Sequence, residues 1–200
     1  MQPFWFLLGM LIITGVTIGA ITSRRRQIRK LRELAQKHRL NYSAEDLIGI
    51  HERYQSLDMI RRGHSRHACH LIFGSTDAGM VTLFCYTYDL GFGIHRTDRH
   101  WWIAVIETTG QYKHWRAYPA DSNTIEGKGE KIERFAICAD RQNTINQLTD
   151  IGIERIFQNV PANYHWEVRN QFVAIAAPHH TDPAIPDQLL TTACKLAHLL

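Results

Sequence analysis

A chain of 200 residues has room for one ordinary domain and an extra segment, but not for two domains joined by linkers. Its content of 44% hydrophobic and 21% charged residues is that of a folded protein and argues against intrinsic disorder. The net charge of +4 does not indicate nucleic-acid binding, because residues 1–40 carry +7 (eight Lys/Arg, one acid) and residues 41–200 carry −3 (fifteen Lys/Arg, eighteen Asp/Glu).

The first predicted element is a transmembrane helix in residues 1–22. From Phe4 to Ile21 the chain has eighteen residues without a charge. As a helix they would span roughly 27 Å, close to the thickness of the hydrocarbon core of a bilayer. A cleaved signal peptide would need a basic residue before this stretch, and none precedes it. The side chains expected to form the span include Phe4, Trp5, Leu8, Leu11, Ile12, Val16 and Ile21.

A basic juxtamembrane helix in residues 23–40 is predicted to follow the span. Its six cations are Arg24, Arg25, Arg26, Arg29, Lys30 and Arg32. By the positive-inside bias they predict a single-pass protein of the bacterial inner (cytoplasmic) membrane, with the N-terminus outside and the domain in the cytoplasm. Four cysteines without a Cys-x-x-Cys spacing agree with that reducing compartment. Whether the cations only set topology or also bind anionic lipid headgroups is left open.

Two further patterns lie in this N-terminal region. A stripe at helical spacing is expected to pack on the domain, and consists of Ile28, Leu31, Leu34, Ala35 and His38. Gly15 and Gly19 give one Gly-x-x-x-Gly, which would allow two spans to approach closely. Self-association of the chain is therefore one possible partnership, beside the lipid bilayer and a separate protein.

Residues 41–200 are predicted to form a single cytoplasmic α+β domain, with an antiparallel sheet and two helices in its C-terminal half. A capping pattern of Ser43 and Asp46 predicts a short helix that continues to Tyr54. Runs rich in β-branched and aromatic residues predict strands at Ala68–Gly74, Met80–Leu90, Trp101–Thr109, His114–Tyr118 and Lys131–Ala139. The remaining predictions are a helix over Asn143–Asn159, a hairpin of Tyr164–Val168 and Gln171–Ala176, and a last helix over Ile185–Leu200.

A cluster of imidazoles marks the start of the first predicted strand of this sheet. His64, His67 and His70 lie within seven residues, together with Cys69. Imidazole and thiolate are preferred zinc ligands, so these residues are the candidate metal ligands of the chain. On a strand, however, His67 and Cys69 would share one face and His70 the other, and the neighbouring arginines would repel a cation. A solvated polar strand end is the alternative interpretation.

Polar loops offer a second set of candidates for chemistry. His95, Asp98 and His100 precede the aromatic pair Trp101-Trp102, and a His/Asp pair of this kind can serve acid–base catalysis. No nucleophile in an activating setting accompanies them. The run His179-His180-Thr181-Asp182 has the same limitation.

The apolar anchor, the basic segment and the run Gly79–Tyr88, which reads GMVTLFCYTY, together resemble a loose group of uncharacterised bacterial single-pass membrane-anchored proteins. The resemblance spans most of the chain and implies neither an activity nor catalytic residues.

The sequence therefore favours a membrane-tethered, non-catalytic binding or assembly domain without a cofactor and without nucleic acid as a partner. A membrane-bound, metal-dependent enzyme using the His64–His70 region, with zinc as the alternative cofactor, is the first alternative. A module that binds anionic lipid surfaces through its basic segment is the second.

Overall fold

The computed structural model describes residues 2–120, 129–179, 182 and 184–200; for residues 2–16, 18 and 20 it describes the backbone alone. Its helices are α1 Gln2–Lys37, α2 Ile50–Arg53, α3 Asp58–Arg61, α4 Gln142–Asp150, α5 Glu154–Gln158 and α6 Ile185–Leu199, with a 3-10 turn at Gly93–His95. Its strands are β1 Asn41–Glu45, β2 His64–Thr76, β3 Gly79–Leu90, β4 Thr97–Pro119, β5 Glu130–Ile132, β6 Phe135–Ala139 and β7 His165–Pro178.

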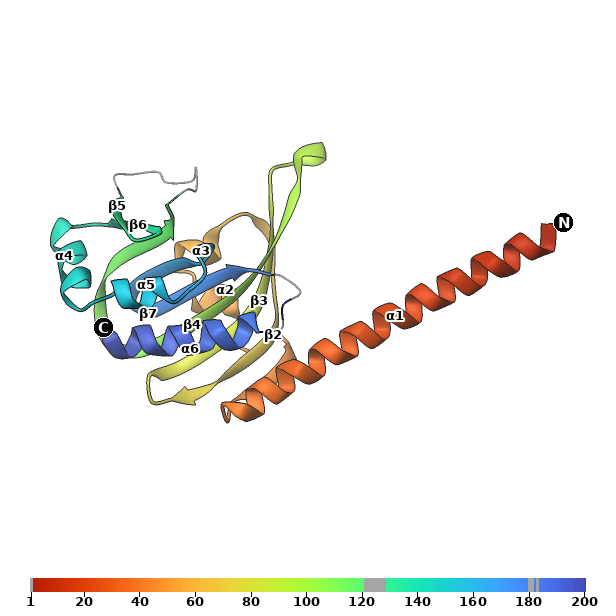
Figure 1. Ribbon diagram of the computed structural model, residues 1–200, viewed down its shortest axis with the longest axis horizontal. Coiled ribbons are helices and arrows are strands. Elements are labelled where there is room, and N and C mark those ends of the chain that lie inside the picture. Colours follow the sequence, from red (N-terminus) through yellow and green to blue (C-terminus); the bar gives the residue numbers. More distant parts are fainter. Residues whose placement is uncertain (1, 121–128, 180–181, 183) are drawn as a thin grey trace.

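One antiparallel sheet of seven strands forms the body of the domain (Figure 1). The strands follow the order β1-β2-β3-β4-β6-β5, and β7 also pairs with β4. The 23-residue strand β4 is the axis of this sheet, because its first half pairs with β3 and its second half with β6. The predicted α+β class with an antiparallel sheet is confirmed.

Each face of the sheet buries its own hydrophobic core. Leu83, Trp102 and Ala104 face the core that α1, α4, α5 and α6 cover, whereas their neighbours Phe84 and Ile103 face the core under α2 and α3. Successive side chains of a strand point to opposite faces, so an apolar run on two faces requires a cover on both. The run Met80–Leu90 carries this two-sided pattern, as its sequence predicts.

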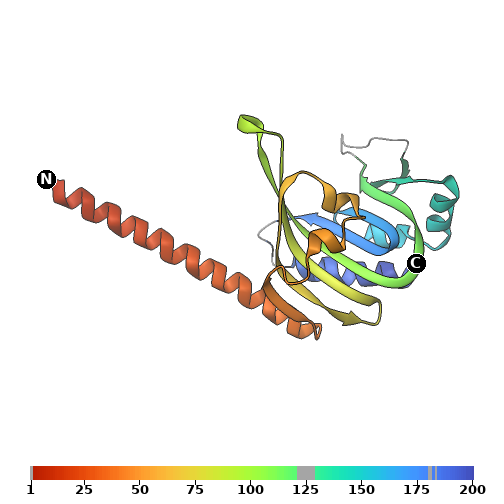
Figure 2. The same ribbon diagram turned by 180° about the vertical axis from the view of Figure 1, so that it is seen from behind.

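Helix α1 is continuous, and its two halves have different surroundings. Leu31, Leu34 and Ala35 are buried against the sheet, as the predicted stripe requires. The N-terminal half projects away from the domain (Figures 1 and 2). Counting only the residues that the structure describes, no helix is both long and apolar enough to cross a membrane. The predicted span falls largely outside those described side chains: Phe4, Trp5, Leu8, Leu11, Ile12 and Val16 are not described, and Ile21 is exposed.

Two local predictions were wrong because a polar residue plays a part that the sequence pattern does not show. Residues 41–45 form strand β1, since Asp46 rather than Ser43 accepts the amides of Ile48, Gly49 and Ile50 before the helix. The predicted hairpin around Asn170 is one strand, β7, in which Asn170 has φ 54° at a register shift opposite Tyr112.

The predicted helix over residues 143–159 was also wrong, because it is interrupted at a glycine. Gly152 adopts φ 78°, a left-handed conformation that ends α4 and separates it from α5. The strands predicted at Trp101–Thr109 and His114–Tyr118 are, conversely, a single strand, because β4 continues through irregular pairing with β7 between Glu107 and Trp115.

Candidate functional site

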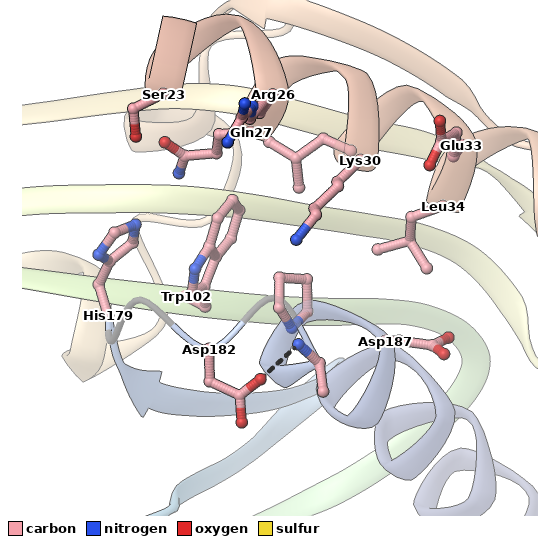
Figure 3. A pocket seen from close by; sticks show the side chains of 13 residues that line it. Ser23, Arg26, Gln27, Lys30, Glu33, Leu34, Trp102, His179, Asp182 and Asp187 are labelled. Atoms are coloured by element: carbon pink, nitrogen blue, oxygen red, sulfur yellow. Dashed lines mark hydrogen bonds between the residues drawn. The ribbon is translucent and has the colours of Figure 1, made fainter. Parts of the chain in front are cut away.

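A pocket of about 490 Å³ lies between the basic part of α1 and the start of α6 (Figure 3). One side is formed by α1, and the other by Trp102 of β4 with the chain that follows β7. Its lining residues on α1 are Ser23, Arg26, Gln27, Lys30, Leu31, Glu33 and Leu34. Across from them lie Trp102, His179, Asp182, Ala184, Pro186 and Asp187.

The α1 side of the pocket is amphipathic. Residues three and four positions apart share a helix face, so Arg26, Lys30 and Leu34 lie in one row along the pocket. Leu31 and Leu34 are buried and form an apolar floor, whereas Arg26 and Lys30 are exposed. In Figure 3 the Lys30 side chain extends from α1 toward α6. The pocket thus offers an apolar base beneath a cationic rim.

Trp102 forms the aromatic part of the opposite side. It is buried, and its ring stacks on the imidazole of His179 with 5.5 Å between centroids. His179 is held in place through its backbone amide, which donates to the carbonyl of His100 at 2.8 Å. Asp182 follows at the entrance of α6, where it accepts the backbone N–H of Ala184 at 2.9 Å, the dashed line in Figure 3.

A clamp at the far end of the pocket fixes α1 to α6. Asp187 accepts hydrogen bonds from Lys37 Nζ at 2.6 Å and from His38 Nε2 at 2.7 Å. Burial acts to raise the pKa of Asp187, but the hydrogen bonds and the charges of Lys37 and His38 outweigh it and hold the pKa below its ordinary value. The carboxylate is therefore ionised at neutral pH, and the two walls of the pocket are joined by an ion pair.

The charges of the pocket are unequally satisfied. Asp187 is paired with Lys37, Asp182 with the amide of Ala184, and Glu33 lies 3.7 Å from Arg29. In the part of the chain that the structure describes, neither Arg26 nor Lys30 has an acidic partner. Two cations without an acidic partner among the described residues, next to an apolar floor, fit a ligand that has an anionic head and an apolar part.

The other cations of the predicted basic segment point elsewhere. Arg32 lies over the ring of Tyr42 at 5.6 Å. Burial lowers the pKa of His70, and the charge of Arg24 adds to this shift. Arg29 faces Glu33, and Arg25 is exposed and does not line the pocket. The cations of the basic segment thus lie on different faces of α1, and only some of them line the pocket.

The three candidate metal ligands near Gly63 face different neighbours. His64 stacks on Phe92 at 4.8 Å, while His70 Nδ1 lies 2.9 Å from the hydroxyl of Tyr42. His64 and His67 border a separate, open pocket of about 480 Å³, which His70 does not line. Within the described residues, the ligand atoms of His64, His67 and His70 do not form a group close enough to hold one ion.

A different cluster brings potential metal ligands together in the interior. Ligand atoms of Asp58, His114 and Glu167 lie within 4.8 Å of one another. Both oxygens of Glu167, a buried residue, accept backbone amides, from Asp58 at 2.7 Å and from Met59 at 2.9 Å. Asp58 is in turn paired with Arg116 at 2.9 Å and Arg169 at 3.4 Å. Because donors already occupy these carboxylates, the cluster joins α3 to the sheet and is a poor place for a cation.

The sequence did not reveal the pocket as a site. Trp102 reads as a core aromatic of a strand, and Lys30 as one of six topological cations. Only the stripe of Ile28, Leu31 and Leu34 hinted at it, because it placed the face beside Arg26 and Lys30 against the domain. The polar loop candidates are also separated: His179 lines the pocket, whereas His95 lies at the exposed β3–β4 turn.

No protein-family model matches this chain, and no curated protein matches it in sequence. Among solved structures, it is similar to the crystal structure of the mycobacterial trehalose monomycolate transport factor A, TtfA. The TM-score is 0.66 at 13% sequence identity, and the match covers 88% of this chain and 95% of that chain. At this identity the likeness shows a shared fold, which extends over nearly the full length of both chains.

Proposed function

We propose that this chain is a membrane-tethered, non-catalytic binding domain at the cytoplasmic face of a bacterial membrane, with a pocket for an amphiphile that has an anionic head. The observation that carries the proposal is that two cations without an acidic partner among the described residues, Arg26 and Lys30, lie beside the apolar floor and the indole of Trp102. The ligand enters with its head toward the cations and its apolar part toward the indole.

The place of the pocket along α1 supports this proposal. The predicted span ends at Ile21, and the pocket begins at Ser23. With the span in the bilayer, the mouth of the pocket lies at the level of the lipid headgroups, where amphiphiles are concentrated. A ligand can then pass between the bilayer and the pocket without crossing bulk water.

The shared fold offers independent support for a role without catalysis. TtfA is described as a trehalose monomycolate transport factor, and the match includes most of this chain. We therefore place the amphiphile-binding domain in transport or assembly at the membrane, where a protein can hold or hand over a ligand without changing it.

Native mass spectrometry of the full chain in a neutral detergent tests the pocket. The probes are dihexanoyl phosphatidic acid, dihexanoyl phosphatidylcholine and inorganic phosphate at equal concentrations. We expect the anionic lipid to bind several-fold more strongly than either other probe, because it alone supplies both the charge and the apolar chains. Equal binding of both lipids would contradict a role for the cationic rim in binding. Binding of phosphate as strong as that of the anionic lipid would contradict a role for the apolar floor.

A matched pair of variants locates the bound probe. Lys30→Glu and Arg25→Glu change the net charge equally, and both replace an exposed residue of α1. Only Lys30 lines the pocket. Binding of the anionic lipid should fall several-fold more in Lys30→Glu than in Arg25→Glu. Equal losses in both variants would mean that the basic segment attracts anions without a defined site, and would contradict the proposal.

A further inference from the structure

The connection between β3 and β4 exposes large apolar side chains at its tip. Phe92 is 80% exposed and Ile94 96% exposed, and every residue from Gly91 to His100 is exposed. Figure 1 shows this hairpin as a narrow projection from the sheet. Apolar side chains in such a position contribute nothing to the core, so they indicate a contact outside the domain.

The tip has a defined shape. Gly91 has φ 75°, and a Cβ there would lie 2.5 Å from the carbonyl oxygen of His95. Arg96 lies behind the tip and pairs with Asp89 at 2.6 Å, which ties the two strands together. The ring of Phe92 stacks on His64 of β2. The apolar pair is therefore presented on a built turn.

The hairpin tip can be located relative to the pocket. Trp102 and His179 lie opposite the Ser23 end of α1, and His179 is bonded to His100. From Trp102 to Thr97 the strand extends by about 17 Å, at about 3.3 Å per residue, and the tip lies beyond Thr97. In Figures 1 and 2 the hairpin and α1 both project away from α4 and from the β5–β6 pair. The tip thus continues from the level of Ser23 toward the side of the predicted span.

We propose that Phe92 and Ile94 form a second membrane contact, in which the hairpin tip inserts into the interface of the bilayer beside the tether. This inference rests on the proposed tether, which places the boundary of the bilayer at Ser23. Two apolar side chains on a narrow turn suit a lipid interface, whereas a stable protein interface requires a much larger surface. Arg99, two residues after Thr97, is exposed and has no acidic partner among the described residues, so its long cationic side chain is free to meet anionic headgroups.

Photocrosslinking of the full chain in native membranes tests the contact. The photoreactive residue p-benzoylphenylalanine replaces Ile94, Ile151 or Ile12 in three separate chains, and adducts are identified by mass spectrometry. Ile151 is the matched control, since it is an exposed isoleucine at the end of α4. Ile12 reports on the tether itself. We expect lipid adducts at Ile94 and Ile12 and few at Ile151.

Each outcome decides between the two proposals. Lipid adducts at Ile12 but not above the Ile151 level at Ile94 would overturn the hairpin contact and leave the tether. Lipid adducts at neither Ile12 nor Ile94 would overturn both, and protein adducts at Ile94 would replace the lipid by a protein partner. With the probe at Ile94, Phe92→Asp should lower the lipid adduct several-fold and Phe92→Leu should retain it; equal yields from these two variants would also contradict the contact.

Discussion

Two regions of this molecule invert the usual distribution of residues, and they do so for different reasons. Around Glu167 a carboxylate is buried beneath α3, and each of its oxygens has a backbone donor. At the β3–β4 tip, Phe92 and Ile94 are largely exposed, and the ring of Phe92 stacks on His64. A buried polar group and an exposed apolar group both cost free energy, so both require an explanation.

The two regions differ in what offsets this cost in free energy. Every partner of Glu167 belongs to the chain itself, so the cluster of Asp58, His114 and Glu167 is explained by folding. Ile94 has no such partner in the described domain, so its explanation must lie outside. Substitutions in the first region should therefore alter stability, and substitutions in the second should alter membrane contact alone.

The largest effect is expected for Glu167→Gln. This change removes a buried charge, and it places an amide N–H₂ against the backbone donors of Asp58 and Met59. We expect a loss of about 3 kcal/mol in the free energy of unfolding. Urea unfolding of the full chain in detergent, followed by circular dichroism, measures it. Asp150→Asn, an exposed change of the same kind, is the control, and equal losses in the two variants would refute the role of the buried cluster.

A second effect should appear on acidification. Burial lowers the pKa of His165 to about 4, and the charge of Arg62 adds to this shift. In the unfolded chain the imidazole titrates near its ordinary value of 6.5, so stability should fall as the pH drops below about 6.5 and level off near 4. Between pH 7 and pH 5 the expected loss is about 2 kcal/mol.

The variant His165→Phe isolates this contribution from that of other groups. It keeps an aromatic ring against Trp101 and Tyr118 but cannot take up a proton. Its urea midpoint should change less between pH 7 and pH 5 than that of the parent chain. The same pH dependence in both proteins would show that His165 is not the group responsible.

A smaller effect is expected at the clamp between α1 and α6. Asp187→Asn removes the ion pair with Lys37 and weakens the bond to His38. Because these groups are partly exposed, we expect the free energy of opening the docked part of α1 to fall by about 1 kcal/mol. This corresponds to roughly fivefold faster hydrogen exchange of its backbone amides. Glu33→Gln, which touches only the exposed Arg29 pair, should leave that exchange unchanged. Unchanged exchange in Asp187→Asn as well would mean that apolar packing alone holds the helix.

The smallest effect on stability should come from the hairpin tip. The double variant Phe92→Asp/Ile94→Asp removes little buried surface besides the contact of Phe92 with His64, so the free energy of unfolding in detergent should change by less than about 0.5 kcal/mol. A loss comparable to that of Glu167→Gln would show that the tip belongs to the folded core, and would cancel the distinction between the two regions.

Much of the sheet could be predicted because its signals are local. The alternation of Leu83 with Phe84 fixes a two-sided strand, and the spacing of Leu31 and Leu34 fixes the docked face of α1. The errors occurred where one backbone conformation overrides a pattern. Asn170 at positive φ continues a strand that looks like a turn, and Gly152 at positive φ divides a helix that looks continuous.

The candidate site was less accessible from the sequence, because its parts meet only in three dimensions. Lys30 and Trp102 each have an ordinary local explanation, and they meet only because α1 packs against the sheet. The imidazoles of His64, His67 and His70 show the opposite error. They are close in sequence, yet in space His64 contacts Phe92 and His70 contacts Tyr42. Phe92 and Ile94 lay within a segment that reads as a turn, where two apolar residues are easily overlooked.

Alkaline carbonate extraction tests whether the N-terminal helix holds the domain at the membrane. Membranes from bacteria that express the full chain are washed at high pH, and the pellet and supernatant are compared with those of a Leu11→Lys/Ile12→Asp variant, whose charges oppose insertion. We expect the parent chain to stay in the pellet and the variant to shift to the supernatant. Release of the parent chain into the supernatant would contradict the tether, and with it the membrane-level placement of both the pocket and the hairpin.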